Sequence, residues 1–91
     1  MADDSETVWI AELCVSDSTE QKLTHKHRIT VDEVEQAVKC VAGLRGSWDH
    51  DRARGSRMLL HAAVRGRPVL VVLYPTSDPD VWNLGSVHFR T

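Results

Sequence analysis

The chain has 91 residues, of which 42% are hydrophobic and 26% charged, and its formal net charge is −2. This length allows one compact domain and excludes two. The longest apolar run, Val69 to Tyr74, is far shorter than the roughly 20 residues that cross a bilayer, and the acidic start lacks the pattern of a signal peptide. We therefore expect one cytoplasmic domain over residues 7–91, preceded by a flexible polar arm at residues 1–6.

The small net charge conceals an uneven distribution. Residues 1–43 hold four basic and nine acidic residues, a net charge of −5, whereas residues 44–91 hold seven Arg and four Asp, a net charge of +3. The second half contains no lysine. Because the guanidinium fork pairs with phosphate or carboxylate through two hydrogen bonds, this usage favours recognition of phosphate or of an acidic partner. The alternative is that these arginines are solvated strand and turn residues.

The first expected element is a strand over Thr7 to Val15, because this stretch is rich in β-branched and aromatic residues. Alternation along the strand places Trp9 and Leu13 on one face and Ile10 on the other. The Ser-Asp-Ser sequence that follows ends the strand, and one of its residues caps a short helix over residues 19–25.

A second helix is predicted over Val31–Val41. Thr30 and Glu33 form a capping box at its start, in which each side chain accepts a hydrogen bond from the backbone N–H of the other residue. Gly43 is placed to end the helix in a left-handed conformation. One face of the helix is apolar, at spacings of three and four, and consists of Val31, Val34, Ala37, Val38 and Val41.

The rest of the chain has strand character. Residues 57–64 and 67–74 read as a β-hairpin whose turn contains Gly66, and the run VLVVLY within it is apolar enough for a central strand. Residues 81–90 form a last strand, and Leu44 to Trp48 a further short one, followed by a polar loop. We therefore expect an α+β fold in which a small antiparallel sheet of four to five strands packs against the two helices.

One region resembles a known family. The segment from Glu20 through Lys26 and His27 to the second helix is similar to the K-x-x-x-K-H-gly-x-(S/T)-φ-(D/E)-E-A region of BrnT-like toxins, where φ is apolar. The hairpin with its Gly-Arg pair and a final strand ending in arginine extend the resemblance to about residues 19–90. Arg28 stands where the family has glycine, and the basic residues of the family's last strand are reduced to His88 and Arg90.

BrnT-like toxins belong to the RelE-type superfamily of small bacterial ribonucleases. The resemblance therefore implies a RelE/BrnT-like fold, metal-independent endoribonuclease activity on RNA, and neutralisation by a cognate antitoxin, for BrnT usually a ribbon-helix-helix protein. Within the matched segment, His27 is expected to cap or tie the turn between the helices rather than to do chemistry.

RNA cleavage by its own 2′-hydroxyl needs a base, an acid and cations directed at the phosphoryl oxygens. His88 and Arg90 share a parity on the last strand with Trp82, so one face would carry a histidine, a guanidinium and an aromatic platform for a base. The preceding hairpin supplies further catalytic candidates, Arg57, His61 and Arg67, and further RNA contacts, Arg65 and Tyr74. The alternatives are a sheet histidine without chemistry at His88 and packing roles for the tryptophans.

No cofactor or metal is expected. His25-x-His27 and Asp49-His50-Asp51 each offer two ligands, but neither has a zinc spacing. Cys14 and Cys40 belong to no motif and are expected to be buried, reduced thiols.

The competing hypothesis is a catalytically inactive toxin-fold protein that serves as an interaction or regulatory module. The acidic first half and three tryptophans suit an interface with aromatic anchors. An antitoxin or immunity-type protein is a third reading, without a basic DNA-reading arm to favour it. The expected partners are RNA, an antitoxin or other protein, or a second copy of the chain, and no membrane.

Overall fold

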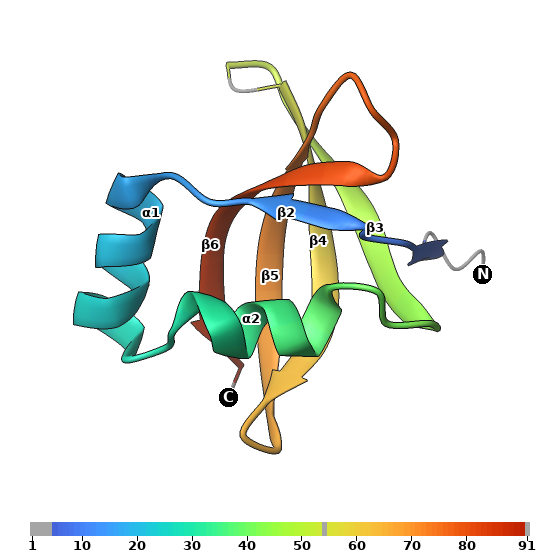
Figure 1. The fold of residues 1–91 in the computed structure, drawn as a ribbon. Coiled ribbons are helices and arrows are strands. Elements are labelled where there is room, and N and C mark those ends of the chain that lie inside the picture. The colour runs from blue at the N-terminus through green and yellow to red at the C-terminus, as the bar shows by residue number, and fades with distance from the viewer. Residues whose placement is uncertain (1–4, 54, 91) are drawn as a thin grey trace.

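The computed structural model describes residues 5–53 and 55–90, which form six strands and three helical segments. In chain order these are β1 (Glu6–Val8), β2 (Glu12–Cys14), α1 (Asp17–Lys22), η1 (Leu23–His27), α2 (Val31–Val38), β3 (Leu44–Asp51), β4 (Gly55–Val64), β5 (Arg67–Pro75) and β6 (Val81–Phe89). All six strands lie in one sheet with the order β1-β3-β4-β5-β6-β2 (Figure 1). The α+β class is confirmed. The sheet has more strands than predicted, and it is mixed because β2 runs parallel to β6.

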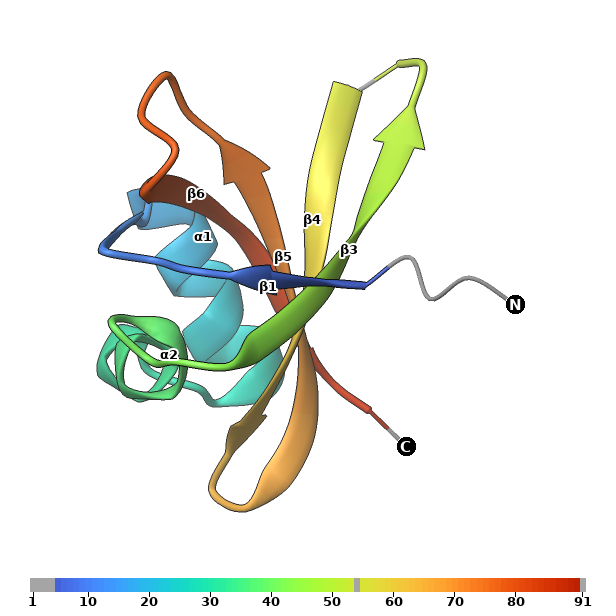
Figure 2. The same ribbon diagram turned by 90° about the vertical axis from the view of Figure 1, so that its right-hand side faces the viewer.

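The predicted first strand is instead two short strands at opposite edges of the sheet. β1 pairs with β3, and three residues later β2 pairs with β6. This segment therefore crosses from one edge to the other and curls the sheet (Figure 2). The crossing breaks the predicted alternation, because Ile10 and Leu13 are both buried whereas Trp9 is 45% exposed.

The start of α2 is as predicted. The Thr30 hydroxyl accepts from the backbone N–H of Glu33 at 3.2 Å, and the Glu33 carboxylate accepts from the backbone N–H of Thr30 at 3.1 Å. Val34 and Val38 are fully buried against the sheet. The capping box and the apolar face together explain why this stretch is helical.

The end of α2 differs from the prediction. The helix stops at Val38, and Cys40 adopts a left-handed conformation with a φ of 55°. Its backbone N–H donates to the carbonyl of Ile10 at 2.7 Å, so a bond to the crossing segment replaces a further helical turn. Gly43 also has a positive φ, but it lies in the turn before β3.

The first helical region begins earlier than predicted. Ser16 caps α1 by accepting from the backbone N–H of Thr19 at 3.2 Å. The helix continues as the π-helical turn η1, and Arg28, with a φ of 53°, ends it. Leu23, at the start of η1, is only 2% exposed and anchors this region to the core.

β3 and β4 extend farther than predicted. They pair from Arg45 and His61 out to Asp51 and Gly55, where a polar loop was expected. The turn between β4 and β5 is as predicted, because Arg65 and Gly66 both have positive φ, which matches the twist of a hairpin.

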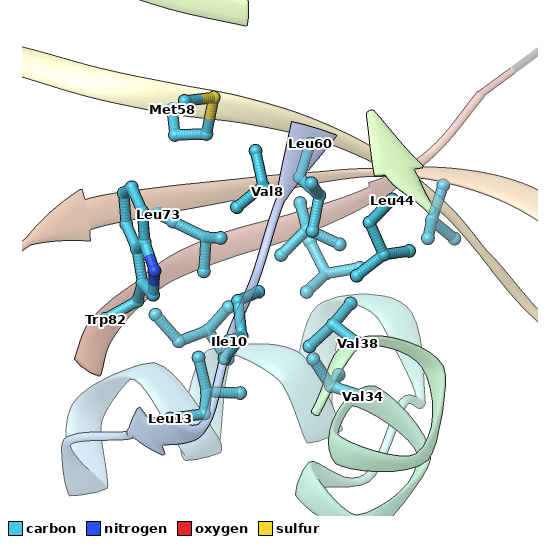
Figure 3. Close-up of a cluster of buried hydrophobic side chains, with 14 of the residues drawn as sticks. Val8, Ile10, Leu13, Val34, Val38, Leu44, Met58, Leu60, Leu73 and Trp82 are labelled. Carbon is cyan, nitrogen blue, oxygen red and sulfur yellow. The ribbon is translucent and has the colours of Figure 1, made fainter. Parts of the chain in front are cut away.

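The core lies between the sheet and a layer formed by α2 and the crossing segment (Figure 3). The largest fully buried side chains are Ile10, Leu23, Ile29, Met58, Leu60 and Leu73. Among the described residues, no polar or charged side chain is buried. Cys14 and Cys40 are free thiols as expected, but both are exposed rather than buried. No helix within residues 5–53 and 55–90 has the length and apolarity needed to span a membrane.

Candidate functional site

One face of the sheet is turned away from α2, and we call it the outer face. His61, Leu70 and His88 lie opposite one another there on β4, β5 and β6. α2 lies on the other side of the sheet, and the helical region that begins with α1 lies at the β6 edge (Figures 1 and 2). No described helix therefore covers the side chains that point to the outer face.

A pocket of about 420 Å³ opens where α1 and η1 meet the outer face. β2 pairs with only Val81–Asn83 of β6, and α1 lies beside β6 in Figure 1. The pocket is lined by Thr19, Lys22, Leu23, Lys26, His27, Arg57, Val72, Tyr74, Gly85, Ser86, Val87 and His88. One wall is thus helical and the other is the sheet.

The helical wall carries two lysines toward the pocket. Lys22 and Lys26 are four residues apart, a spacing that places side chains on the same side of a helix. Burial of Leu23 between them fixes the helix beside the sheet. Within the described part of the chain, neither lysine has a carboxylate in ion-pair distance.

The sheet wall contributes a guanidinium held by two neighbours. Arg57 Nε donates to Asp49 Oδ2 at 2.7 Å, and this bond is the main cause that raises the Arg57 pKa, with a smaller contribution from Tyr74. The Tyr74 ring packs on Gly85, where a Cβ would lie 2.5 Å from Cε2 of the ring. Gly85 therefore allows the tyrosine to lie close to β6 beside Arg57.

Two histidines meet at the junction of the walls. The rings of His27 and His88 are 5.3 Å apart, edge to face, and the Ser86 hydroxyl lies 3.0 Å from His88 Nε2. Burial lowers the pKa of His27, as do the nearby charges of His88 and Lys26. His27 is therefore more often neutral than an ordinary histidine and has a lone pair available to accept a proton.

The lining as a whole is cationic. Among the described residues it contains the basic side chains of Lys22, Lys26 and Arg57 and two histidines, but no carboxylate. Asp49 neutralises part of the Arg57 charge from β3, outside the lining. Such a pocket is suited to an anion, and hydroxyl groups of Thr19 and Ser86 add neutral hydrogen-bonding groups.

Two further predicted residues form a second cluster on the outer face. Arg90 Nη1 lies 2.8 Å from His61 Nδ1. Since a guanidinium can only donate, Nδ1 is the acceptor. The outer face thus carries five of the predicted residues in two places. His88, Arg57 and Tyr74 line the pocket, and the Arg90 guanidinium meets His61 on β4.

Three predicted residues lie elsewhere. Trp82 is 7% exposed in the core, and an irregularity in the pairing of β5 and β6 breaks the parity that was expected to join it to His88. Arg65 binds Glu33 at 2.6 Å, beneath the start of α2. Arg67 lies over the ring of Phe89, 4.1 Å from its centroid. Trp82 is therefore not an exposed platform, and the two arginines are not part of the pocket.

Sequence reasoning missed the helical wall. Lys22 and Lys26 were read only as part of a resemblance, and His27 was expected to tie the turn rather than to enter a site. The spacing Lys-x-x-x-Lys-His contained the signal, because it places two cations and an imidazole on neighbouring positions of a helix end.

Within the described residues, no group of three or more His, Cys, Asp or Glu side chains is arranged to hold a metal ion. Comparisons with protein-family models, with curated proteins and with solved structures gave no match to this chain.

Proposed function

We propose that this protein is a metal-independent endoribonuclease of the type II toxin kind, and that the pocket binds a phosphodiester of RNA. The observation that carries the proposal is the pairing of His27 with His88 in a lining whose described residues include three basic side chains and no carboxylate. The resemblance of residues 19–90 to BrnT-like toxins supports the same reaction. An antitoxin partner rests on that resemblance.

The reaction divides between the two histidines. His27 accepts the proton of a ribose 2′-hydroxyl, whose oxygen forms a bond to the adjacent phosphorus. The bond from phosphorus to the 5′-oxygen breaks, and His88 donates a proton to that oxygen. The products are a 2′,3′-cyclic phosphate and a 5′-hydroxyl. Lys22, Lys26 and Arg57 lie around this pair and stabilise the charge that grows on the phosphoryl oxygens.

The geometry favours the protonation state that this division needs. Two charged imidazoles 5.3 Å apart repel each other, and Lys26 adds to the repulsion at His27. Burial is the largest cause that lowers the pKa of His27, and the charges of His88 and Lys26 lower it further. We therefore assign the role of base to His27.

The test is incubation of purified protein with single-stranded RNA in the presence of a metal chelator. We expect fragments that end in a 2′,3′-cyclic phosphate. His88→Ala should remove cleavage, while Arg52→Gln, in the turn between β3 and β4, should leave it unchanged. Intact RNA with folded wild-type protein, together with normal growth on induced expression, would contradict the proposal.

A second candidate function is protein binding without catalysis, and a different surface favours it. Trp48 is 38% exposed, and its indole N–H already donates to Glu6 at 2.9 Å. Its ring lies 5.9 Å from that of Trp82, beside a groove of about 270 Å³ that also includes Pro75 and Pro79. Exposed aromatic and proline surface of this kind is typical of protein interfaces.

The two candidate functions predict different effects of the same substitutions. In an inactive module, Trp48→Ala should abolish capture of the partner while His27→Ala and His88→Ala change nothing measurable. In a toxin, the histidine variants should end growth arrest, and Trp48→Ala should leave RNA cleavage intact.

A further inference from the structure

We infer that the outer face holds a second phosphate site, made by Arg90 and His61, and that its ligand is single-stranded RNA spanning both sites. The inference rests on the proposed function, because it takes the first phosphate to lie in the pocket. The inference specifies single-stranded RNA as the substrate class. It also implies a minimum length, because the strand has to reach both sites.

The second site is defined by a guanidinium with most of its donors available. Among the described residues, Arg90 makes one side-chain hydrogen bond, to His61 Nδ1, and has no carboxylate partner. Its backbone N–H donates to the carbonyl of Pro68 at 2.9 Å, so the residue stays attached to β5 beyond the end of β6. Because His61 Nδ1 accepts the hydrogen bond from Arg90, the ring proton of a neutral His61 lies on Nε2. The cluster therefore presents a positively charged fork and an imidazole N–H.

Arg90 differs in this respect from two other arginines of the sheet. Arg57 is bound to Asp49, and Arg65 is bound to Glu33 through both carboxylate oxygens. A guanidinium held by a neutral imidazole keeps its full charge for an external anion.

The space between the two sites suits bases rather than phosphates. His61 and His88 flank Leu70 in the pairing of β4, β5 and β6, so they are two strand spacings apart, about 10 Å. The floor between the clusters includes Leu70 and Leu59, which are apolar and half-buried. A single strand can bind cations at both ends of this floor and place its unpaired bases on the apolar middle. A duplex keeps its bases paired inside and cannot make that contact.

The test compares the binding of oligonucleotides of different lengths. A fluorescent 2′-O-methyl RNA hexamer serves as the probe, because the methyl group blocks the attacking oxygen and prevents cleavage. Unlabelled 2′-O-methyl dinucleotide, tetranucleotide and duplex hexamer compete with it in an anisotropy assay. For the wild-type protein we expect the tetranucleotide to bind at least about tenfold more tightly than the dinucleotide, the value of one good charge-assisted contact. The duplex should bind more weakly than the single strand.

Arg90→Gln should remove the gain from dinucleotide to tetranucleotide and leave dinucleotide affinity unchanged. It should also lower the slope of log affinity against log salt by about 0.7, as expected when one phosphate contact to a single strand is lost. Arg52→Gln, which makes the same change of charge away from the outer face, should keep both the gain and the slope.

The outcomes separate this inference from the proposal on which it rests. A length gain that survives in Arg90→Gln, or a duplex that binds as tightly as the single strand, would overturn the second site while Lys26→Gln still weakens every ligand. If Lys26→Gln and Arg90→Gln both leave the hexamer unaffected, the phosphate pocket itself is wrong. Circular dichroism of each variant checks that the fold is kept.

Discussion

The two helical regions of this small domain use their charges in opposite ways. Around α2, Lys39 lies within 3.6 Å of Glu12 and 3.8 Å of Glu35, and Glu33 is bound by Arg65. In α1 and η1, Lys22 and Lys26 have no carboxylate partner among the described residues and face a pocket. Exposed ion pairs of this kind stabilise the fold only slightly, and their charges are already occupied by a partner. Unpaired cations gathered around a hollow are instead available to a ligand, and this contrast locates the site.

The largest effect is expected for catalysis at η1. His27→Ala should lower the cleavage rate about 10²–10⁴-fold, the usual contribution of a general base. In the wild-type protein the rate should rise with pH on the acid side of the profile as His27 loses its proton, and it should fall again at higher pH once His88 has lost the proton that it donates. Because the pKa of His27 is lowered, the midpoint of the rise should lie below the ordinary histidine value of 6.5. Rate profiles between pH 4 and 8 would show this, and a midpoint above 6.5 would argue against His27 as the base.

The matching change in α2 should affect stability and not the reaction. Val38 is fully buried, and Val38→Ala removes apolar volume from the core. We expect the free energy of unfolding to fall by about 2 kcal/mol. Urea unfolding measures this loss, and cleavage per folded molecule should stay as in the wild type. A large loss of activity in folded Val38→Ala would mean that α2 contributes to the site.

The lysines give a direct comparison of the two regions. If the pocket binds a phosphodiester as proposed, Lys26→Gln should weaken binding of single-stranded RNA about tenfold, because the pocket loses a cation that has no carboxylate partner among the described residues. Lys39→Gln, with the same change of charge in the paired region, should leave RNA affinity close to that of the wild type. Anisotropy titrations at one fixed salt concentration would decide. Equal losses in both variants would indicate diffuse attraction to the chain rather than a site.

The ion pair between Glu33 and Arg65 should also contribute to the loss of stability in acid. The bond to Arg65 and the backbone N–H of Thr30 hold the pKa of Glu33 at about 2, against an ordinary value of 4.5. The stabilisation is therefore fully present above pH 4.5 and is lost as the pH falls toward 2. Thermal melting of the wild type should show part of its decline over this range, and Glu33→Gln should lack that part. An unchanged acid profile in Glu33→Gln would show that this ion pair has no net effect.

The sequence predicted those parts of the fold that local chemistry specifies. The Thr30 capping box, the apolar face of α2 and the β4–β5 hairpin depend on neighbouring residues, and all are present. The end of α2 depends on the carbonyl of Ile10, which is remote in sequence, and the helix was predicted too long. The mixed sheet escaped prediction for the same reason, because β1 and β2 find partners about 40 and 70 residues away.

The candidate site was predicted only in part, for a related reason. Parity along one strand identified His88, but the irregular pairing near Gly85 reverses the face on which Trp82 lies. Lys22 and His27 come from a helix whose position beside β6 is set by burial of Leu23. The sequence pattern of β6 alone shows neither the irregular pairing with β5 nor the helix that packs beside it.

The smallest expected effect concerns the residue that joins the two helical regions. Arg28 has a φ of 53°, a left-handed conformation that costs an L-residue roughly 1–2 kcal/mol and glycine almost nothing. Glycine loses more backbone entropy on folding, so the net gain from Arg28→Gly should be below about 1 kcal/mol. Arg28→Ala keeps the Cβ and should bring no such gain, which separates backbone strain from the loss of charge. Urea midpoints of the two variants test this, and equal midpoints would show that η1 ends at Arg28 without strain. A gain in Arg28→Gly alone would indicate that glycine, the residue of the BrnT-like pattern at this position, fits the turn that places His27 against His88.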